Sequence, residues 1–119
     1  DEETQPLLDG PVEQLGEHFI DYLLSSSDRV RGVFLALIRA SDSDGVAPRL
    51  RATHEAAFVG PLRSRLDGAD AELRSRLAAA LVGGLLYSLW IVGDEELLAA
   101  GHAELVRRYG ALLQALITP

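Results

Sequence analysis

Apolar residues recur every three or four positions along most of this chain, which is the spacing of amphipathic helices. The pattern predicts about five helices, separated by clusters of Ser, Asp and Gly that favour turns. We place them at residues 12–25, 28–40, 46–66, 70–92 and 94–118. The chain is therefore predicted to be an all-α domain, with the last two helices joined only by Gly93 and Asp94.

The fourth predicted helix is apolar on nearly every side, because residues 77–92 include one ordinary polar side chain, Ser88. Such a helix must be buried all round, and a chain of 119 residues cannot cover it alone, so we expect a partner subunit. Ala79 and Gly83 form a stripe of small residues. Each Gly costs about 1 kcal/mol relative to Ala inside a helix, so the glycines predict a close approach of another helix. The larger apolar stripe beside it consists of Leu73, Leu77, Ala80, Gly84, Tyr87 and Ile91.

The fifth predicted helix has a similar stripe, and two consecutive helices of this kind are typical of an antiparallel hairpin. Two hairpins from two subunits would form an intersubunit four-helix bundle, so we predict a homodimer. The sequence leaves open which face of residues 77–92 meets the partner subunit and which faces a pocket. The predicted interface consists of Ala79, Ala80, Gly83, Gly84, Leu98, His102, Leu105, Tyr109, Leu112 and Leu116.

Two prolines mark the third predicted helix. Pro48 lies in its first turn, where a missing N–H group is harmless. Pro61 falls inside the helical pattern and removes the hydrogen bond to the Ala57 carbonyl, so it should kink the helix. The kink is expected to free a carbonyl group near His54 and Phe58.

Charge is distributed unevenly along the chain. The net charge is −7, and the first 28 residues contain eight acidic groups and no basic one. Such a segment repels phosphate, so this chain by itself is predicted to be a poor nucleic-acid binder. Residues 1–10 are predicted to form a linker or frayed end, and residues 11–119 a single helical domain.

The apolar run at residues 77–92 is shorter than the roughly 20 residues that span a membrane, and Arg74, Arg76 and Asp94 flank it. No secretory signal is recognisable at the acidic N-terminus. We therefore expect a soluble, cytoplasmic protein without a membrane partner. The sequence contains neither Met nor Lys, and the missing Met favours a piece of a longer protein.

The residues that enzymes need are absent or badly spaced. His18, His54 and His102 lack the Glu three positions earlier that a di-iron bundle uses, and no nucleotide-binding loop or nucleophile elbow is present. We interpret Glu13, Glu17 and Asp21 as a solvated helix face rather than a metal cluster, and the residues 42–45 as a turn rather than a calcium loop. We predict no catalytic activity, no cofactor and no metal.

Aromatic residues are spread over the first four predicted helices, where they fit either an ordinary core or the walls of a cavity beside the expected kink. His54 is either a polar anchor in an apolar pocket or a histidine that is hydrogen-bonded in the core. His102 lies on the stripe of the fifth helix, where an interface or core position is favoured, and His18 is expected to be exposed.

The order of these features resembles the C-terminal regulatory domain of TetR-type bacterial transcriptional repressors, especially those of actinobacteria. The resemblance covers residues 12–118. It rests on Arg51-Ala-Thr-His-Glu-Ala-Ala57 leading to Gly60-Pro-Leu62, on the helix from Asp70 to Gly84, and on the ending Tyr109-Gly-Ala-Leu-Leu-Gln-Ala-Leu-Ile117. In that family the last two long helices form the dimer, and the preceding helices surround an inducer pocket.

The resemblance implies that DNA is bound by an N-terminal helix-turn-helix, which this chain lacks, so that part was removed, lies outside the chain or was never present. A ligand would bias the orientation of two such heads, which must reach major grooves about 34 Å apart. The runner-up interpretation is a stand-alone helical module that binds another protein through residues 77–92. The implied effector is small and largely apolar, and the implied ligand-binding residues are Phe19, Tyr22, Phe34, Ile38, His54, Phe58, Tyr87 and Trp90.

Overall fold

The computed structural model describes residues 10–41, 45 and 47–119; residues 1–9, 42–44 and 46 lie outside the described part. The predicted linker at residues 1–10 and the predicted turn at residues 42–45 lie largely outside the described residues. The described residues form helices and turns without a strand, which confirms the all-α prediction. The first elements are a 3-10 turn η1 (Val12–Gln14), helices α2 (Leu15–Ser25), α3 (Ser27–Ala40) and α4 (Ala47–His54), a π-helical turn η2 (Glu55–Val59) and α5 (Gly60–Arg63).

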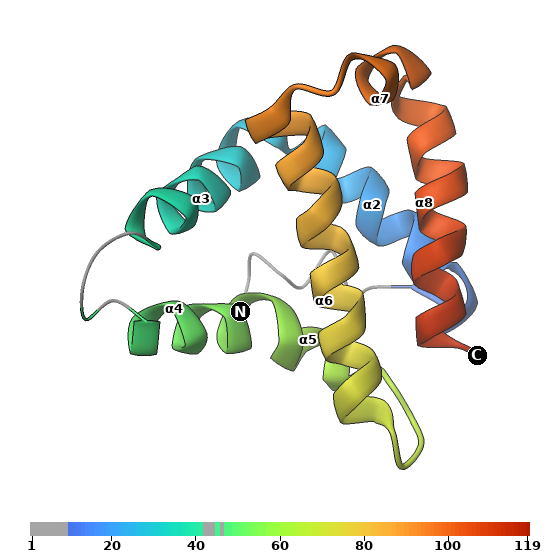
Figure 1. The fold of residues 1–119 in the computed structure, drawn as a ribbon. Helices are drawn as coiled ribbons and strands as arrows, with labels where there is room; N and C mark the ends of the chain where they lie inside the picture. Colours follow the sequence, from blue (N-terminus) through green and yellow to red (C-terminus); the bar gives the residue numbers. More distant parts are fainter. Residues whose placement is uncertain (1–9, 42–44, 46) are drawn as a thin grey trace.

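The second half of the chain forms a hairpin whose arms are antiparallel (Figure 1). The long helix α6 (Ala71–Tyr87) continues into a second π-helical turn, η3 (Ser88–Val92). After a turn come the short helix α7 (Glu95–Ala100) and the long helix α8 (His102–Ile117). Helix α8 packs against α6 and also against α2.

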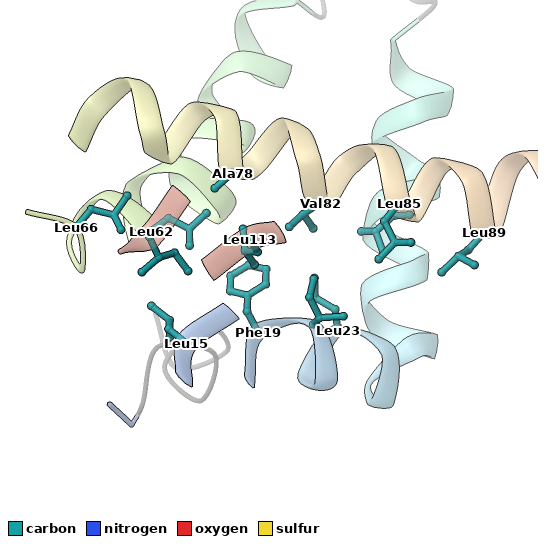
Figure 2. Packing of buried hydrophobic residues seen from close by; sticks show 13 residues of the cluster. Leu15, Phe19, Leu23, Leu62, Leu66, Ala78, Val82, Leu85, Leu89 and Leu113 are labelled. Carbon is teal, nitrogen blue, oxygen red and sulfur yellow. The ribbon is translucent and has the colours of Figure 1, made fainter. Parts of the chain in front are cut away.

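One hydrophobic core joins α2, α6 and α8 with the end of α5 (Figure 2). Each helix contributes the residues of one face at helical spacing, as expected for amphipathic helices. Leu15, Ile20, Leu62, Leu86 and Leu113 are fully buried in it. The remaining members of the core are Phe19, Leu23, Leu66, Ala78, Val82, Leu85, Leu89 and Ile117.

Helices α2 and α8 cross at two glycines, Gly16 and Gly110. A Cβ atom on Gly16 would lie 2.4 Å from the Gly110 carbonyl oxygen, closer than side-chain carbons come in proteins. The Gln114 side chain bridges the crossing, because it accepts from the Gly16 amide at 2.8 Å and donates to the Val12 carbonyl at 2.8 Å. The close approach predicted at Gly83 and Gly84 concerns a second subunit, and it stays a prediction.

The third predicted helix is a composite of α4, η2 and α5. Its irregularity lies one turn before Pro61 rather than at it: the Gly60 amide donates to the Glu55 carbonyl, a bond of π-helical spacing. Pro61 has no amide hydrogen of its own to offer the preceding turn, so the helix is already perturbed at this point. The predicted interruption is therefore present, but it takes the form of a wide turn between the two helical pieces.

The fifth helix was predicted as one element from residue 94 to 118, and this is wrong. Asp94 does cap its start, since the carboxylate accepts from the amides of Glu96 and Leu97. The helix then breaks at Gly101, whose φ of 87° and ψ of 163° are available only to glycine at low cost. Helix α8 restarts at His102, so the last two long helices are joined by a whole short helix rather than by Gly93 and Asp94 alone.

One helix among the described residues, Ala71–Val92, is long and apolar enough to cross a membrane by length and composition. It comprises 22 residues, and 39% of its most apolar window is buried inside the domain. The apolar run at residues 77–92 is shorter than this helix, whose first turns also contain Arg74 and Arg76. One such helix is weak evidence for a membrane span, because the core helix of a soluble protein has the same length and composition.

Candidate functional site

A pocket of about 190 Å³ lies between α3, the α4–η2 segment and α6. Helix α3 contributes Phe34 and Leu37, and the α4–η2 segment contributes His54 and Phe58. Helix α6 lies along the remaining wall, with Leu86 fully buried. The residues that α6 places in the pocket are Ala79, Ala80, Gly83 and Leu86.

The aromatic side chains of the pocket contact one another or a neighbouring ring. His54 and Phe58 are one turn apart, and their ring centroids lie 6.2 Å apart with an angle of 39° between the rings. Phe34 packs edge-on against Trp90 of η3, at 5.8 Å between centroids. His54 is exposed, whereas Ala79 and Leu86 are buried, so His54 lies toward the rim of the pocket and these two apolar side chains toward its base.

The π-helical turn below the pocket is held to α6 by two carboxylates and two guanidinium groups. Glu55 contacts Arg63 and Arg76, each at 2.8 Å. Glu72 contacts Arg63 at 3.1 Å and Arg76 at 2.8 Å. Hydrogen bonds from Arg76 and then Arg63 lower the pKa of the Glu55 carboxyl below its ordinary value of 4.5. This network, which we call the Glu55 network, fixes the turn that separates His54 from Phe58.

Three of the eight predicted ligand residues, Phe34, His54 and Phe58, line this pocket. The others lie elsewhere: Phe19 is a core residue with 3% exposure, and Tyr22 packs against the same core. Trp90 is not a lining residue but contacts Phe34, which is. Helical period alone could not separate the core face of α2 from the pocket face of α3. Ile38 and Tyr87 are likewise not among the lining residues.

The small residues of α6 divide between two faces. Ala79 is buried and lines the pocket, as does Gly83, although both were predicted to lie at the interface. Gly84 is exposed, and Ala80 is both exposed and part of the pocket lining. A Cβ atom on Gly83 or Gly84 would meet no atom of another described element within 4 Å, so neither glycine makes a close helix contact among the described residues. Leu37 and Leu86 were missed because nothing in their sequence context distinguishes them from core leucines.

Apolar side chains are exposed along the rest of α6 and on α8. On α6, Leu73 is 59% exposed, and Leu77 and Tyr87 are each 47% exposed. On α8, Leu112 is 56% exposed. The Tyr109 hydroxyl donates to the Leu81 carbonyl and so joins the two helices. We call Leu73, Leu77, Gly84, Tyr87, Ile91, Tyr109 and Leu112 the outer face.

The family model described as "Tetracyclin repressor-like, C-terminal domain" matches residues 13–117. The chain belongs to this family. Neither a curated protein nor a solved structure matches it. The resemblance noted from the sequence is thereby confirmed, and the chain is a TetR-family domain of transcription regulation, a fold that serves regulation rather than catalysis.

Two polar contacts hold the ends of α8 in this TetR-like domain. Arg74 is 7% exposed and donates to the carbonyls of Leu116 and Ile117, at 2.9 and 3.1 Å, and to the carbonyl of Asp67. At the other end, His102 lies 2.7 Å from the exposed Asp21 carboxylate of α2. His102 therefore joins α8 to α2 at the surface of the domain. Of its two predicted positions, interface or core, the core position is wrong.

The pocket of this TetR-like domain offers binding rather than reaction chemistry. His54 is the one polar side chain among its lining residues, and no carboxylate or hydroxyl group joins it there. Among the described residues no cluster of His, Asp or Glu could hold a metal ion. Glu13, Glu17 and Asp21 are exposed, as their interpretation as a solvated face requires. The site fits an apolar molecule with one hydrogen-bonding group.

Proposed function

We propose that this domain binds a small, largely apolar effector between α3, η2 and α6, and that it homodimerises through the outer face. The two events together would control DNA binding by an N-terminal helix-turn-helix that is not in this chain. The observation that carries the proposal is the division of α6: Ala79, Gly83 and Leu86 face the pocket, whereas Leu77 and Tyr87 are exposed on another side.

The outer face supports dimerisation because isolated domains rarely expose large apolar side chains in a continuous row. Leu73, Leu77 and Tyr87 are about half exposed and recur at helical spacing along α6. Leu112 extends the row onto α8, which runs antiparallel to α6. A second copy related by a two-fold axis would cover both helices at once and complete a four-helix bundle.

Effector binding and dimerisation would be coupled through α6, since this helix forms a wall of the pocket and half of the proposed interface. An effector shifts the balance between two arrangements only if it binds one of them more tightly. The Glu55 network ties η2 to α6 and offers such a connection, because Phe58 and Glu55 lie in the same turn and Glu55 pairs with Arg76 of α6.

Light scattering tests the dimer directly. The wild-type domain is expected to have twice the 12.8 kDa mass of one chain at micromolar concentration. Leu77→Glu should give the monomer mass, because it places a charge in the centre of the outer face. Val33→Glu is the matched control: Val33 is 46% exposed on α3, so its substitution should leave the mass unchanged.

A monomeric wild-type domain would contradict the dimer and favour the stand-alone interaction module.

The effector site is tested by measuring the melting temperature of the domain in the presence of neutral apolar compounds of one to four rings, since a ligand of the folded state raises stability by RT ln(1 + [L]/Kd). Hits should lose their effect on Phe58→Ala. If no compound shifts the wild-type protein, or if hits act equally on the variant, the proposed effector site is wrong.

A further inference from the structure

The pocket also restricts the size and chemistry of its ligand. We infer that the effector is a compact, uncharged molecule built on a single ring with one hydrogen-bonding group, and that Gly83 sets its size limit. This inference rests on the proposed function, because it concerns the same pocket.

Volume gives the first restriction. The pocket measures about 190 Å³. Pockets for drug-sized ligands measure about 300–1,000 Å³, whereas a cavity of about 150 Å³ in another protein holds benzene. One ring with a few substituents therefore fills the space, and three fused rings exceed it.

The shape of the α6 wall gives the second restriction. Ala79, Ala80 and Gly83 leave this side of the pocket without any large side chain, and Phe34 and Phe58 bring rings from the other two walls. The space that a Gly83 side chain would occupy contains no protein atom within 4 Å of the Cβ position. Because Gly83 itself lines the pocket, a side chain added at this position would reduce the space available to a ligand. Rings in contact with a ligand ring contribute beyond buried area alone.

Polarity gives the third restriction. The lining residues contain no charged side chain, so a charged ligand would lose its hydration without gaining a partner of opposite charge. His54 is exposed at the rim and Leu86 is buried at the base. A ligand with its ring toward Leu86 and its single polar group toward His54 satisfies both ends of the pocket.

The probes are phenol, toluene, benzoate and acridine, and binding is measured by calorimetry together with the melting temperature. Phenol should bind most tightly, with an affinity about five-fold higher than that of toluene, because one hydrogen bond to His54 raises the affinity by about this factor. Benzoate and acridine should bind at least about ten-fold more weakly than phenol, because of charge and of size respectively. His54→Ala should remove the advantage of phenol over toluene.

Gly83→Leu tests the size limit, with Gly32→Leu as its matched control. Gly32 is an exposed helical glycine of α3 whose Cβ position is also empty, but it lies outside the pocket lining. Gly83→Leu should raise the Kd for phenol about ten-fold or more by filling the pocket, whereas Gly32→Leu should leave it unchanged. If circular dichroism shows that Gly83→Leu is unfolded, Gly83→Ala replaces it, with a rise of about three-fold expected from the added methyl group.

Acridine or benzoate that binds as tightly as phenol would overturn the inference, and so would unchanged phenol affinity in the folded Gly83 variant. If acridine binds and Phe58→Ala abolishes its binding, only the size limit is wrong and the proposed effector site stands. If none of the four probes binds but larger compounds of the apolar panel do, the size limit is again wrong and the proposed effector site stands. If neither the four probes nor any compound of the panel binds, the proposed effector site itself is wrong.

Discussion

The two halves of this domain are packed very differently. Helix α2 meets α8 backbone to backbone at Gly16 and Gly110, and both helices contribute fully buried side chains to the core. Helices α3 and α4 lie on the other side of α6 (Figure 1), and none of their described side chains is buried. Parts of a protein with few buried contacts open at lower cost than its core. The comparison therefore indicates that stability resides in the α2–α8 half, and that the pocket proposed for the effector borders the less tightly packed half.

The largest expected effect comes from breaking the tight half at Gly16. In Gly16→Ala the new methyl group would lie 2.4 Å from the Gly110 carbonyl oxygen and 2.9 Å from the Gln114 amide nitrogen. These are backbone atoms that cannot rotate away, so the helices must separate at a cost of about 3 kcal/mol. Urea denaturation followed by circular dichroism measures the loss in the free energy of unfolding.

Gly32→Ala is the control in the open half. Its Cβ position meets no atom within 4 Å, and alanine is favoured over glycine inside a helix by about 1 kcal/mol. This variant should therefore be slightly more stable than the wild type. Equal effects of the two substitutions would contradict the difference between the halves.

Arg74 gives the second largest effect, because it connects α6 to the last turn of α8. Arg74→Met keeps an apolar stem but leaves the Leu116 and Ile117 carbonyls without their donor. Unpaired carbonyls in a mostly buried place should cost about 2 kcal/mol in the free energy of unfolding. Arg108→Met is the control, since Arg108 is 72% exposed on α8 and its substitution should change stability little. A loss as large in the control would show that the charge matters and the contact does not.

The sequence predicted elements well where a local signal decides, and less well where two distant segments meet. Asp94 could be identified as a helix start because its carboxylate satisfies amides two and three residues later. The break at Gly101 was missed because apolar spacing continues across it from Leu98 to Leu105. Only the backbone angles of Gly101 reveal it.

The glycines show the same limit. Gly83 and Gly84 are neighbours within an apolar run and predict contact with a second subunit, whereas the close contact between helices of one chain is made by Gly16 and Gly110, which lie 94 positions apart. A single sequence does not tell which helix will cross which. For the pocket, the expected kink directed attention to His54 and Phe58, and both line it. The pocket face of α6 could not be predicted in this way, because it depends on how α2 and α8 pack against the other side of the helix.

The smallest expected effect concerns the Glu55 network, which joins the open half to α6. Because hydrogen bonds from Arg76 and Arg63 lower the pKa of Glu55, folding favours its ionised form. The stabilisation is complete above the ordinary pKa of 4.5 and is lost as the pH falls below it. The melting temperature of Glu55→Gln should therefore lie slightly below that of the wild type at about pH 7, and the two should converge toward about pH 3. Arg76→Gln, which removes the main cause of the shift, should reduce this pH dependence. A difference between wild type and Glu55→Gln that stays constant over this range would show that the network does not couple the open half to α6 through charge.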